Sequence, residues 1–184
     1  MTSLTPQKAS IALVQTGGTI DKTYDAWGGT LGNTHGVLDQ MIDALVLEGI
    51  ELHRVALLAK DSLDLTEAEV ELIVYTTLDL AQSHDGVVLL HGTDRLARTG
   101  EQLHAACDGV PASPIVLTGA MRPWILRTSD AQQNLTEALL AVQLLPRGVH
   151  VCMHGRVLAF PGVVKDTKQL RFVRCETTEE PDSK

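Results

Sequence analysis

Five short apolar runs rich in β-branched residues recur along the chain, at intervals typical of a strand followed by a helix. They cover residues 11–15, 52–58, 86–90, 115–117 and 149–153. Because parallel strands need long crossover connections, this alternation predicts a parallel sheet with helices on both faces. We therefore expect a single-domain α/β fold: a three-layer, doubly wound, mostly parallel sheet of the Rossmann or flavodoxin-like class.

Between these runs, apolar residues recur with helical spacing. The spacing predicts helices over residues 38–45, 70–81, 96–107 and 135–142. Thr66 with Glu69 is a capping box for the second helix, and Ser129 with Gln132 is a candidate cap for the fourth. Residues 10–175 are expected to form the folded domain. The ends, residues 1–9 and 176–184, have little to bury and are expected to be flexible.

Composition excludes several classes of function. The 184 residues carry a formal net charge of −8, which argues against binding a nucleic-acid backbone. No apolar run approaches the ~20 residues that a bilayer span requires, so no membrane partner is expected. The three cysteines form no CxxC pair, which favours a reducing, cytoplasmic location over a disulfide framework.

Polar segments follow each of the first four predicted strands. They are Thr16-Gly17-Gly18-Thr19, Lys60-Asp61-Ser62-Leu63-Asp64, His91-Gly92-Thr93-Asp94 and Thr118-Gly119-Ala120-Met121-Arg122-Pro123. Ligands of open parallel sheets bind beyond the carboxyl ends of the strands, where these segments would meet. The sequence therefore predicts a site rich in threonine, carboxylates and glycine. It contains neither a G-x-S-x-G elbow nor a glycine-rich nucleotide-binding motif, which disfavours an α/β-hydrolase and nucleotide use.

His150, Cys152 and His154 alternate along the fifth predicted strand and would share one face. This pattern permits a metal site, but a strand near the sheet edge explains it equally well and no fourth ligand is evident. We expect no metal and no cofactor.

The segment Thr16–Ile20, together with His91–Asp94, resembles the pair of signatures of the bacterial-type L-asparaginases. Two further segments, residues 61–66 and 117–123, resemble segments of the same family. The resemblance extends from about Ile11 to Lys165. It implies a small-molecule substrate and the hydrolysis of L-asparagine, or of L-glutamine, to the corresponding acid and ammonia.

The resemblance also implies roles for individual residues. Thr19 would be the nucleophile, with Tyr24 helping to take up its proton. Thr93, Asp94 and Lys165 would form a second catalytic group in which Lys165 activates Thr93. The implied substrate-binding residues are Gly18, Asp61, Ser62, Gly92, Thr93, Asp94 and Ala120, with Ser62 on the α-carboxylate and Asp94 on the amino group.

Elementary chemistry supports this interpretation. A threonine hydroxyl is a poor nucleophile without a neighbouring base, and a lysine serves as a base only when it is partly desolvated. Val163 and Val164 beside Lys165 favour such desolvation, although Lys168 is a nearby competitor for the role. Thr93 and Asp94 are also typical N-cap residues, so capping the third helix is an alternative role for them.

Most relatives carry a second, C-terminal domain, and the chain ends about where it would begin, so we expect the short, single-domain form. A homo-oligomer, dimer or tetramer, is expected because the relatives assemble. Two alternatives stay open. One is an amidase that prefers L-glutamine or another amide, and the other is a catalytically weak amino-acid-binding module.

Overall fold

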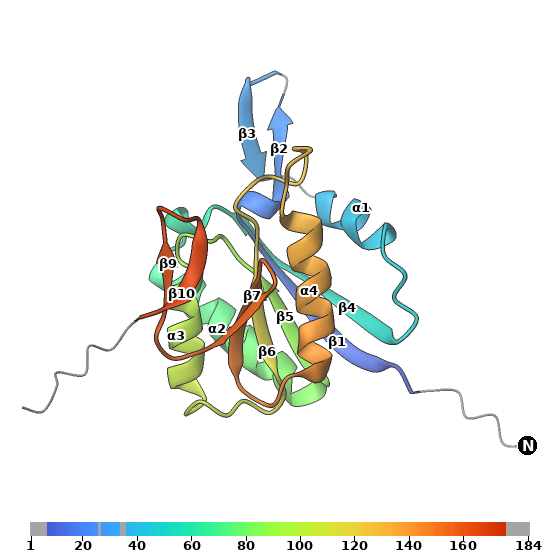
Figure 1. Cartoon of the computed structure of the whole chain (residues 1–184), viewed down its shortest axis with the longest axis vertical. Helices are drawn as coiled ribbons and strands as arrows, with labels where there is room; N and C mark the ends of the chain where they lie inside the picture. Colours follow the sequence, from blue (N-terminus) through green and yellow to red (C-terminus); the bar gives the residue numbers. More distant parts are fainter. Residues whose placement is uncertain (1–6, 26, 34–35, 176–184) are drawn as a thin grey trace, which may run out of the picture.

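Six strands form the central sheet of the computed structural model, which describes residues 7–25, 27–33 and 36–175 (Figure 1). In spatial order they are β4 (Ile50–Lys60), β1 (Ala9–Gly17), β5 (Gly86–Leu90), β6 (Ile115–Thr118), β7 (Val149–Met153) and β8 (Arg156–Ala159). The first five are parallel, whereas β8 runs antiparallel to β7. The parallel strands follow the flavodoxin-like order, in which successive strands are added first on one side of β1 and then, from β5 onward, on the other. The predicted fold class is therefore confirmed.

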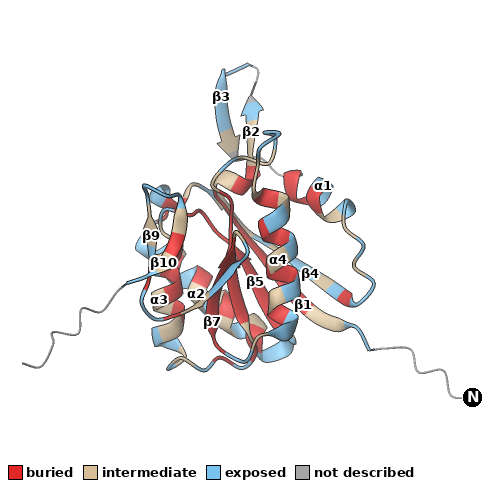
Figure 2. Ribbon diagram, viewed as in Figure 1, coloured by how far each residue is buried: buried red, intermediate tan, exposed pale blue. Residues whose placement is uncertain are grey.

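Helices cover both faces of the sheet. One face packs against α2 (Glu67–Ser83) and α3 (Leu96–Ala106), and the other against α1 (Val37–Asp43) and α4 (Ala131–Leu144). Along β5 the side chains alternate between the two hydrophobic cores, so that Val87 and Leu89 face one and Val88 and Leu90 the other. All five residues of β5 are buried, which explains the unbroken apolar run in the sequence (Figure 2).

Three features of the fold lie outside the predicted pattern. They are the edge strand β8 and two hairpins, β2 (Lys22–Asp25) with β3 (Thr30–Asn33) and β9 (Val163–Asp166) with β10 (Arg171–Arg174). The β2–β3 hairpin projects beyond the end of the sheet (Figure 1). Strands of four residues are too short to give a recognisable alternation in the sequence. The predicted flexible segments fall largely on residues 1–6 and 176–184, which lie outside the described residues.

The helix caps match the predictions in part. Thr66 and Glu69 form the predicted capping box at the start of α2. The fourth helix begins one residue later than Ser129 predicts, because Asp130 occupies its N-cap position. Arg95 occupies the N-cap of α3, so the alternative that Thr93 and Asp94 cap this helix is wrong. None of the helices among the described residues combines the length and hydropathy that crossing a bilayer requires.

Gly18 is a point of close backbone approach at the carboxyl end of β1. Its φ is +91°, and a Cβ atom there would lie 2.5 Å from the Cα of Gly92. Gly162 has nearly the same φ, +90°, but nothing within 4 Å of a Cβ. We expect Gly18→Ala to lower the free energy of unfolding by about 2 kcal/mol more than Gly162→Ala, because only the first adds a steric clash to the backbone strain. Denaturant unfolding of both variants measures the difference, and equal losses would contradict the contact.

Candidate active site

The four polar segments converge where β1, β4, β5 and β6 end, beside the point between β1 and β5 where strand order reverses. Glycines allow them to touch. The Gly18 N–H donates to the Lys60 carbonyl at 2.8 Å. A Cβ on Gly92 would lie 2.6 Å from the Ser62 side chain, and one on Gly119 would lie 2.3 Å from the His91 carbonyl oxygen. The structure therefore brings the predicted loops into direct contact.

Lys165 joins two residues of the loop after β5. Its Nζ donates to Thr93 Oγ1 at 2.8 Å and to Asp94 Oδ1 at 2.7 Å. Thr93 is 3% exposed, and the Lys165 side chain is 14% exposed. The Asp94 side chain, at 45%, is open to solvent. A shielded hydroxyl thus lies within proton-transfer distance of an amine that a carboxylate orients.

The helix that follows Asp94 also holds the strand that carries Lys165. Glu101 in α3 accepts hydrogen bonds from the Gly162 and Val163 N–H groups, at 2.7 and 3.3 Å. The Phe160 ring packs on Gly100, where a Cβ would come within 2.1 Å of it. Lys168, the competing lysine, bonds Asp166 Oδ1 through its backbone N–H, and its side chain is not among the groups at Thr93. Geometry thus distinguishes two lysines that the sequence leaves as alternatives.

The loop after β4 carries Asp61 and Ser62. Ser62 is 1% exposed and accepts a 3.4 Å hydrogen bond from the Arg95 N–H. The Asp61 carboxylate pairs with Lys22 Nζ at 2.6 Å and accepts from the Leu63 N–H at 3.2 Å. The hydrogen bond from Lys22 holds the pKa of Asp61 below its ordinary value. Asp61 therefore ties the base of the β2–β3 hairpin to this loop.

Thr19 and Tyr24 lie on the segment that leaves β1. Thr19 is partly buried and follows Gly18, whose backbone packs against Gly92. Tyr24 is 62% exposed on the projecting hairpin, and its hydroxyl makes no hydrogen bond within the described part of the chain. On the opposite side of the loop cluster, Ala120 is 1% exposed. Tyr24 thus stands apart from the converging loops, whereas Thr19 adjoins them through Gly18.

His91 is a buried member of the loop cluster to which the sequence pattern assigned no role beyond its place in the motif. It is 1% exposed, with Nδ1 2.9 Å from the Gly92 carbonyl oxygen and Nε2 3.0 Å from Thr99 Oγ1. Burial lowers its pKa below the ordinary 6.5. A neutral ring that donates from Nδ1 and accepts at Nε2 fits both partners, so His91 orients the Gly92 peptide between β5 and α3.

This buried histidine has a consequence for stability. In the unfolded chain the His91 ring gains a proton near pH 6.5, whereas in the folded chain it gains one only at a lower pH. The contribution of His91 to the free energy of unfolding is therefore fully present above pH ~6.5 and declines as the pH falls below it. We expect the free energy of unfolding to fall by up to about 1.4 kcal/mol per pH unit for each such group below pH ~6.5. His150, whose pKa burial also lowers, adds to the same slope.

Denaturant unfolding between pH 7.5 and 5 measures this slope. His91→Gln is expected to flatten it, because the substituted side chain does not titrate there. His53→Gln is the matched control, since the His53 side chain is 48% exposed. A slope unchanged by His91→Gln would contradict a neutral buried His91.

The three residues considered for a metal are separated by the fold. His150 and Cys152 lie in β7, but His154 lies in the turn after it and contacts Asp130 at 2.7 Å. Burial raises the pKa of the Cys152 thiol to about 11, which disfavours the thiolate that metal binding needs. Among the residues that the structure describes, no three histidine, cysteine or acidic side chains gather in a metal-binding arrangement.

Known proteins resemble this chain over most of its length. It is 31% identical to a probable L-asparaginase from Deinococcus radiodurans over 92% of this chain and 49% of that protein. It is 30% identical to one of the subunits of a glutamyl-tRNA(Gln) amidotransferase from Methanobrevibacter smithii, over 82% of this chain and 34% of that protein. An L-asparaginase I structure from Vibrio cholerae superposes with a TM-score of 0.75 at 25% identity, over 91% of this chain and 51% of its own.

The chain thus spans a third to a half of the length of these relatives. Residues 10–172 match the protein family described as Asparaginase, N-terminal. This range contains the converging loops and the hairpin strand that carries Lys165. The chain therefore belongs to the asparaginase family, whose N-terminal domain it matches.

Proposed function

We propose that this chain is an amidohydrolase that converts L-asparagine to L-aspartate and ammonia with Thr19 as the nucleophile. The observation that carries the proposal is the contact of Lys165 Nζ with both Thr93 Oγ1 and Asp94 Oδ1. Binding alone needs no buried hydroxyl paired with an amine. Hydrolysis needs such a pair, because the attacking oxygen, from a hydroxyl or from water, must give its proton to a base as it bonds to the carbonyl carbon.

In the proposed reaction the Thr19 oxygen bonds to the side-chain amide carbon, and its proton passes to a neighbouring base. The tetrahedral intermediate then expels ammonia, which leaves with the transferred proton. A water molecule, deprotonated by the Thr93–Lys165 pair, attacks the carbonyl carbon of the resulting ester. The bond from this carbon to the Thr19 oxygen breaks, the proton passes to that oxygen, and the acid is released. Backbone groups of Gly92 and Ala120 are the proposed stabilisers of the oxyanion and the leaving amide.

Substrate binding in this proposal uses the loops after β4 and β5. Ser62 takes the α-carboxylate, and the exposed Asp94 carboxylate takes the amino group. Tyr24 can assist Thr19 only if the β2–β3 hairpin bends toward the strand ends, because its side chain is 62% exposed. The Lys22–Asp61 ion pair at the base of the hairpin would be the fixed point of that movement.

The relatives leave the choice of amide open. They include a glutaminase-asparaginase from Acinetobacter glutaminasificans, 29% identical over 86% of this chain and 50% of that protein. They also include the amidotransferase protein from Methanobrevibacter smithii. A preference for L-glutamine or a larger amide is therefore the second candidate, and assembly into a homo-oligomer is part of the proposal.

Ammonia release from L-asparagine, L-glutamine and a small panel of other amides tests these candidates on the purified chain. The expected result is fastest release from L-asparagine. Faster release from another amide would replace the substrate and keep the chemistry. Calorimetric binding of L-aspartate or L-asparagine without any ammonia release would overturn the enzyme proposal in favour of an amino-acid-binding module.

A further inference from the structure

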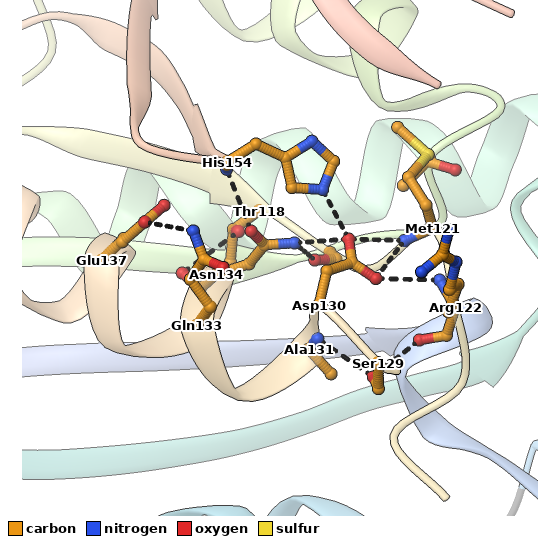
Figure 3. A network of polar contacts seen from close by, with 12 residues as sticks. Thr118, Met121, Arg122, Ser129, Asp130, Ala131, Gln133, Asn134, Glu137 and His154 are labelled. Carbon is orange, nitrogen blue, oxygen red and sulfur yellow. Dashed lines mark hydrogen bonds and ion pairs between the residues drawn. The ribbon is translucent and has the colours of Figure 1, made fainter. Parts of the chain in front are cut away.

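A partly buried polar network lies behind the loop that follows β6 (Figure 3). At its centre is the Asp130 carboxylate, at the N-cap of α4. It accepts from the Met121 and Arg122 N–H groups, each at 2.9 Å, from Asn134 Nδ2 at 2.8 Å and from His154 Nε2 at 2.7 Å. The carboxylate accepts no hydrogen bond from a backbone N–H of α4, and the backbone N–H groups that it binds belong to the loop after β6.

The network fixes the peptide groups on both sides of Ala120. Asn134 Nδ2 donates to the Gly119 carbonyl at 2.9 Å, and the next peptide is held through the Met121 N–H. A trans peptide is planar, with its N–H and C=O on opposite sides. The Gly119 carbonyl and the Ala120 N–H belong to one peptide group, so the N–H points away from Asn134. The Ala120 carbonyl and the Met121 N–H belong to the next, so this carbonyl points away from Asp130.

The turn that contains Ala120 adjoins the catalytic cluster through Gly119. Gly119 packs on the loop after β5, where its Cβ position is 2.3 Å from the His91 carbonyl oxygen and 3.4 Å from Thr93 Cγ2. The donor and acceptor of Ala120 therefore face away from Asp130, with Thr93 close to the start of the same turn. Preorganised backbone groups of this kind act when charge develops in the transition state.

His154 holds the network together from a third element. It lies in the turn between β7 and β8 with φ +56°. Its backbone N–H donates to Asn134 Oδ1 at 3.0 Å, and its ring reaches Asp130. Arg122 and His154 line a cavity of about 260 Å³ together with Gln169 and Leu170, from the turn of the hairpin that carries Lys165. The Glu137 carboxylate also reaches this turn, where it accepts a hydrogen bond from the Gly155 N–H at 2.9 Å.

We propose that His154 is a positioning residue for amide hydrolysis, acting through Asp130 and Asn134 to aim the Ala120 peptide groups at the substrate amide. This inference rests on the proposed function. According to it, the side chains of Asp130, Asn134 and His154 hold the Ala120 N–H and carbonyl groups in position. None of the three touches the reacting atoms.

Two amide substitutions separate this role from a purely structural one. In His154→Gln the side-chain amide reaches about as far as Nε2 and can still donate to Asp130. In His154→Asn it is one methylene too short, although asparagine tolerates a positive φ better than glutamine does. A role confined to the backbone conformation of the turn therefore predicts that the asparagine variant is the better of the two, and the positioning role predicts the reverse.

The measurements are kcat, KM and the thermal midpoint of each variant. His84→Asn is the control, because the His84 ring contacts Leu80 and Ser83 at the end of α2 and His53 in β4, not the Asp130 network. We expect His154→Asn to lower kcat roughly tenfold to hundredfold at nearly unchanged KM, because the lost orientation acts in the transition state. His154→Gln should regain most of the rate, and His84→Asn should keep it.

Equal kcat in wild type and folded His154→Asn would overturn the proposal, as would a rate in the two variants that follows only their thermal midpoints. Absence of turnover in the wild type would overturn the proposed function and this inference with it. The two failures are distinguishable, because the first leaves wild-type ammonia release intact.

Discussion

Thr19→Ala is expected to lower the rate of amide hydrolysis by roughly 10³-fold or more while the protein stays folded. The alanine methyl occupies part of the space of the threonine side chain at a partly buried position, so the packing of Gly18 on Gly92 is kept. What is lost is the oxygen that would bond to the amide carbon. Single-turnover ammonia release, with the thermal midpoint measured in parallel, checks this result.

Thr19→Ser is the matched control, because serine keeps the oxygen and removes only a methyl group. It should retain a measurable fraction of the wild-type rate. If Thr19→Ala turned over L-asparagine nearly as fast as the wild type, the nucleophile would have to be reassigned, and Thr93 would be the next candidate.

Lys165→Met should lower the rate by about 10²- to 10⁴-fold, the range that a positioned base contributes. Methionine has a similar length and tolerates the 14% exposure of the lysine side chain, but it provides no group for Thr93 Oγ1 or Asp94 Oδ1. Stability should fall by only about 1–3 kcal/mol, since one buried hydroxyl loses a partner while Asp94 stays solvated.

Lys168→Met tests the same chemistry three residues away. Lys168 contacts Asp166 through its backbone N–H, which the substitution leaves in place, so near-normal rates are expected. Steady-state ammonia release by the two variants is the measurement. Comparable losses in both, or a larger loss in Lys168→Met, would reject Lys165 as the base.

The positions of the loop motifs were predictable from local patterns. Buried parallel strands give continuous apolar runs, and each run ends where the polar segment begins, as Leu90 and His91 illustrate. The layered α/β class was also predictable, and the flavodoxin-like order that is observed belongs to one of the two classes that the pattern allows. The positions of the strands and loops depend only on which residues of each segment are buried, and the periodicity of that segment encodes this.

The β9–β10 hairpin and the Asp130 network were not predictable in the same way. Lys165 meets Thr93 across 72 positions of the chain, and His154 meets Asp130 across 24. Neither pair has a spacing that any local pattern specifies. Alternation places His154 on a strand, but β7 ends at Met153 and the positive φ of His154 turns its ring toward α4.

By itself, the sequence determined the layered parallel sheet, the polar loops at one end of it and the threonines and carboxylates that those loops carry. Alternation and helical periodicity record which faces must be buried, and burial of apolar surface drives folding whichever partner provides it. Only the tertiary structure decided that Lys165 and not Lys168 reaches Thr93, that Tyr24 stands on a projecting hairpin, and that Asp130 serves the Ala120 turn. Such contacts are hydrogen bonds and ion pairs, which form only when the donor–acceptor distance is correct to within a few tenths of an ångström. That distance is set only when elements far apart in the sequence pack together.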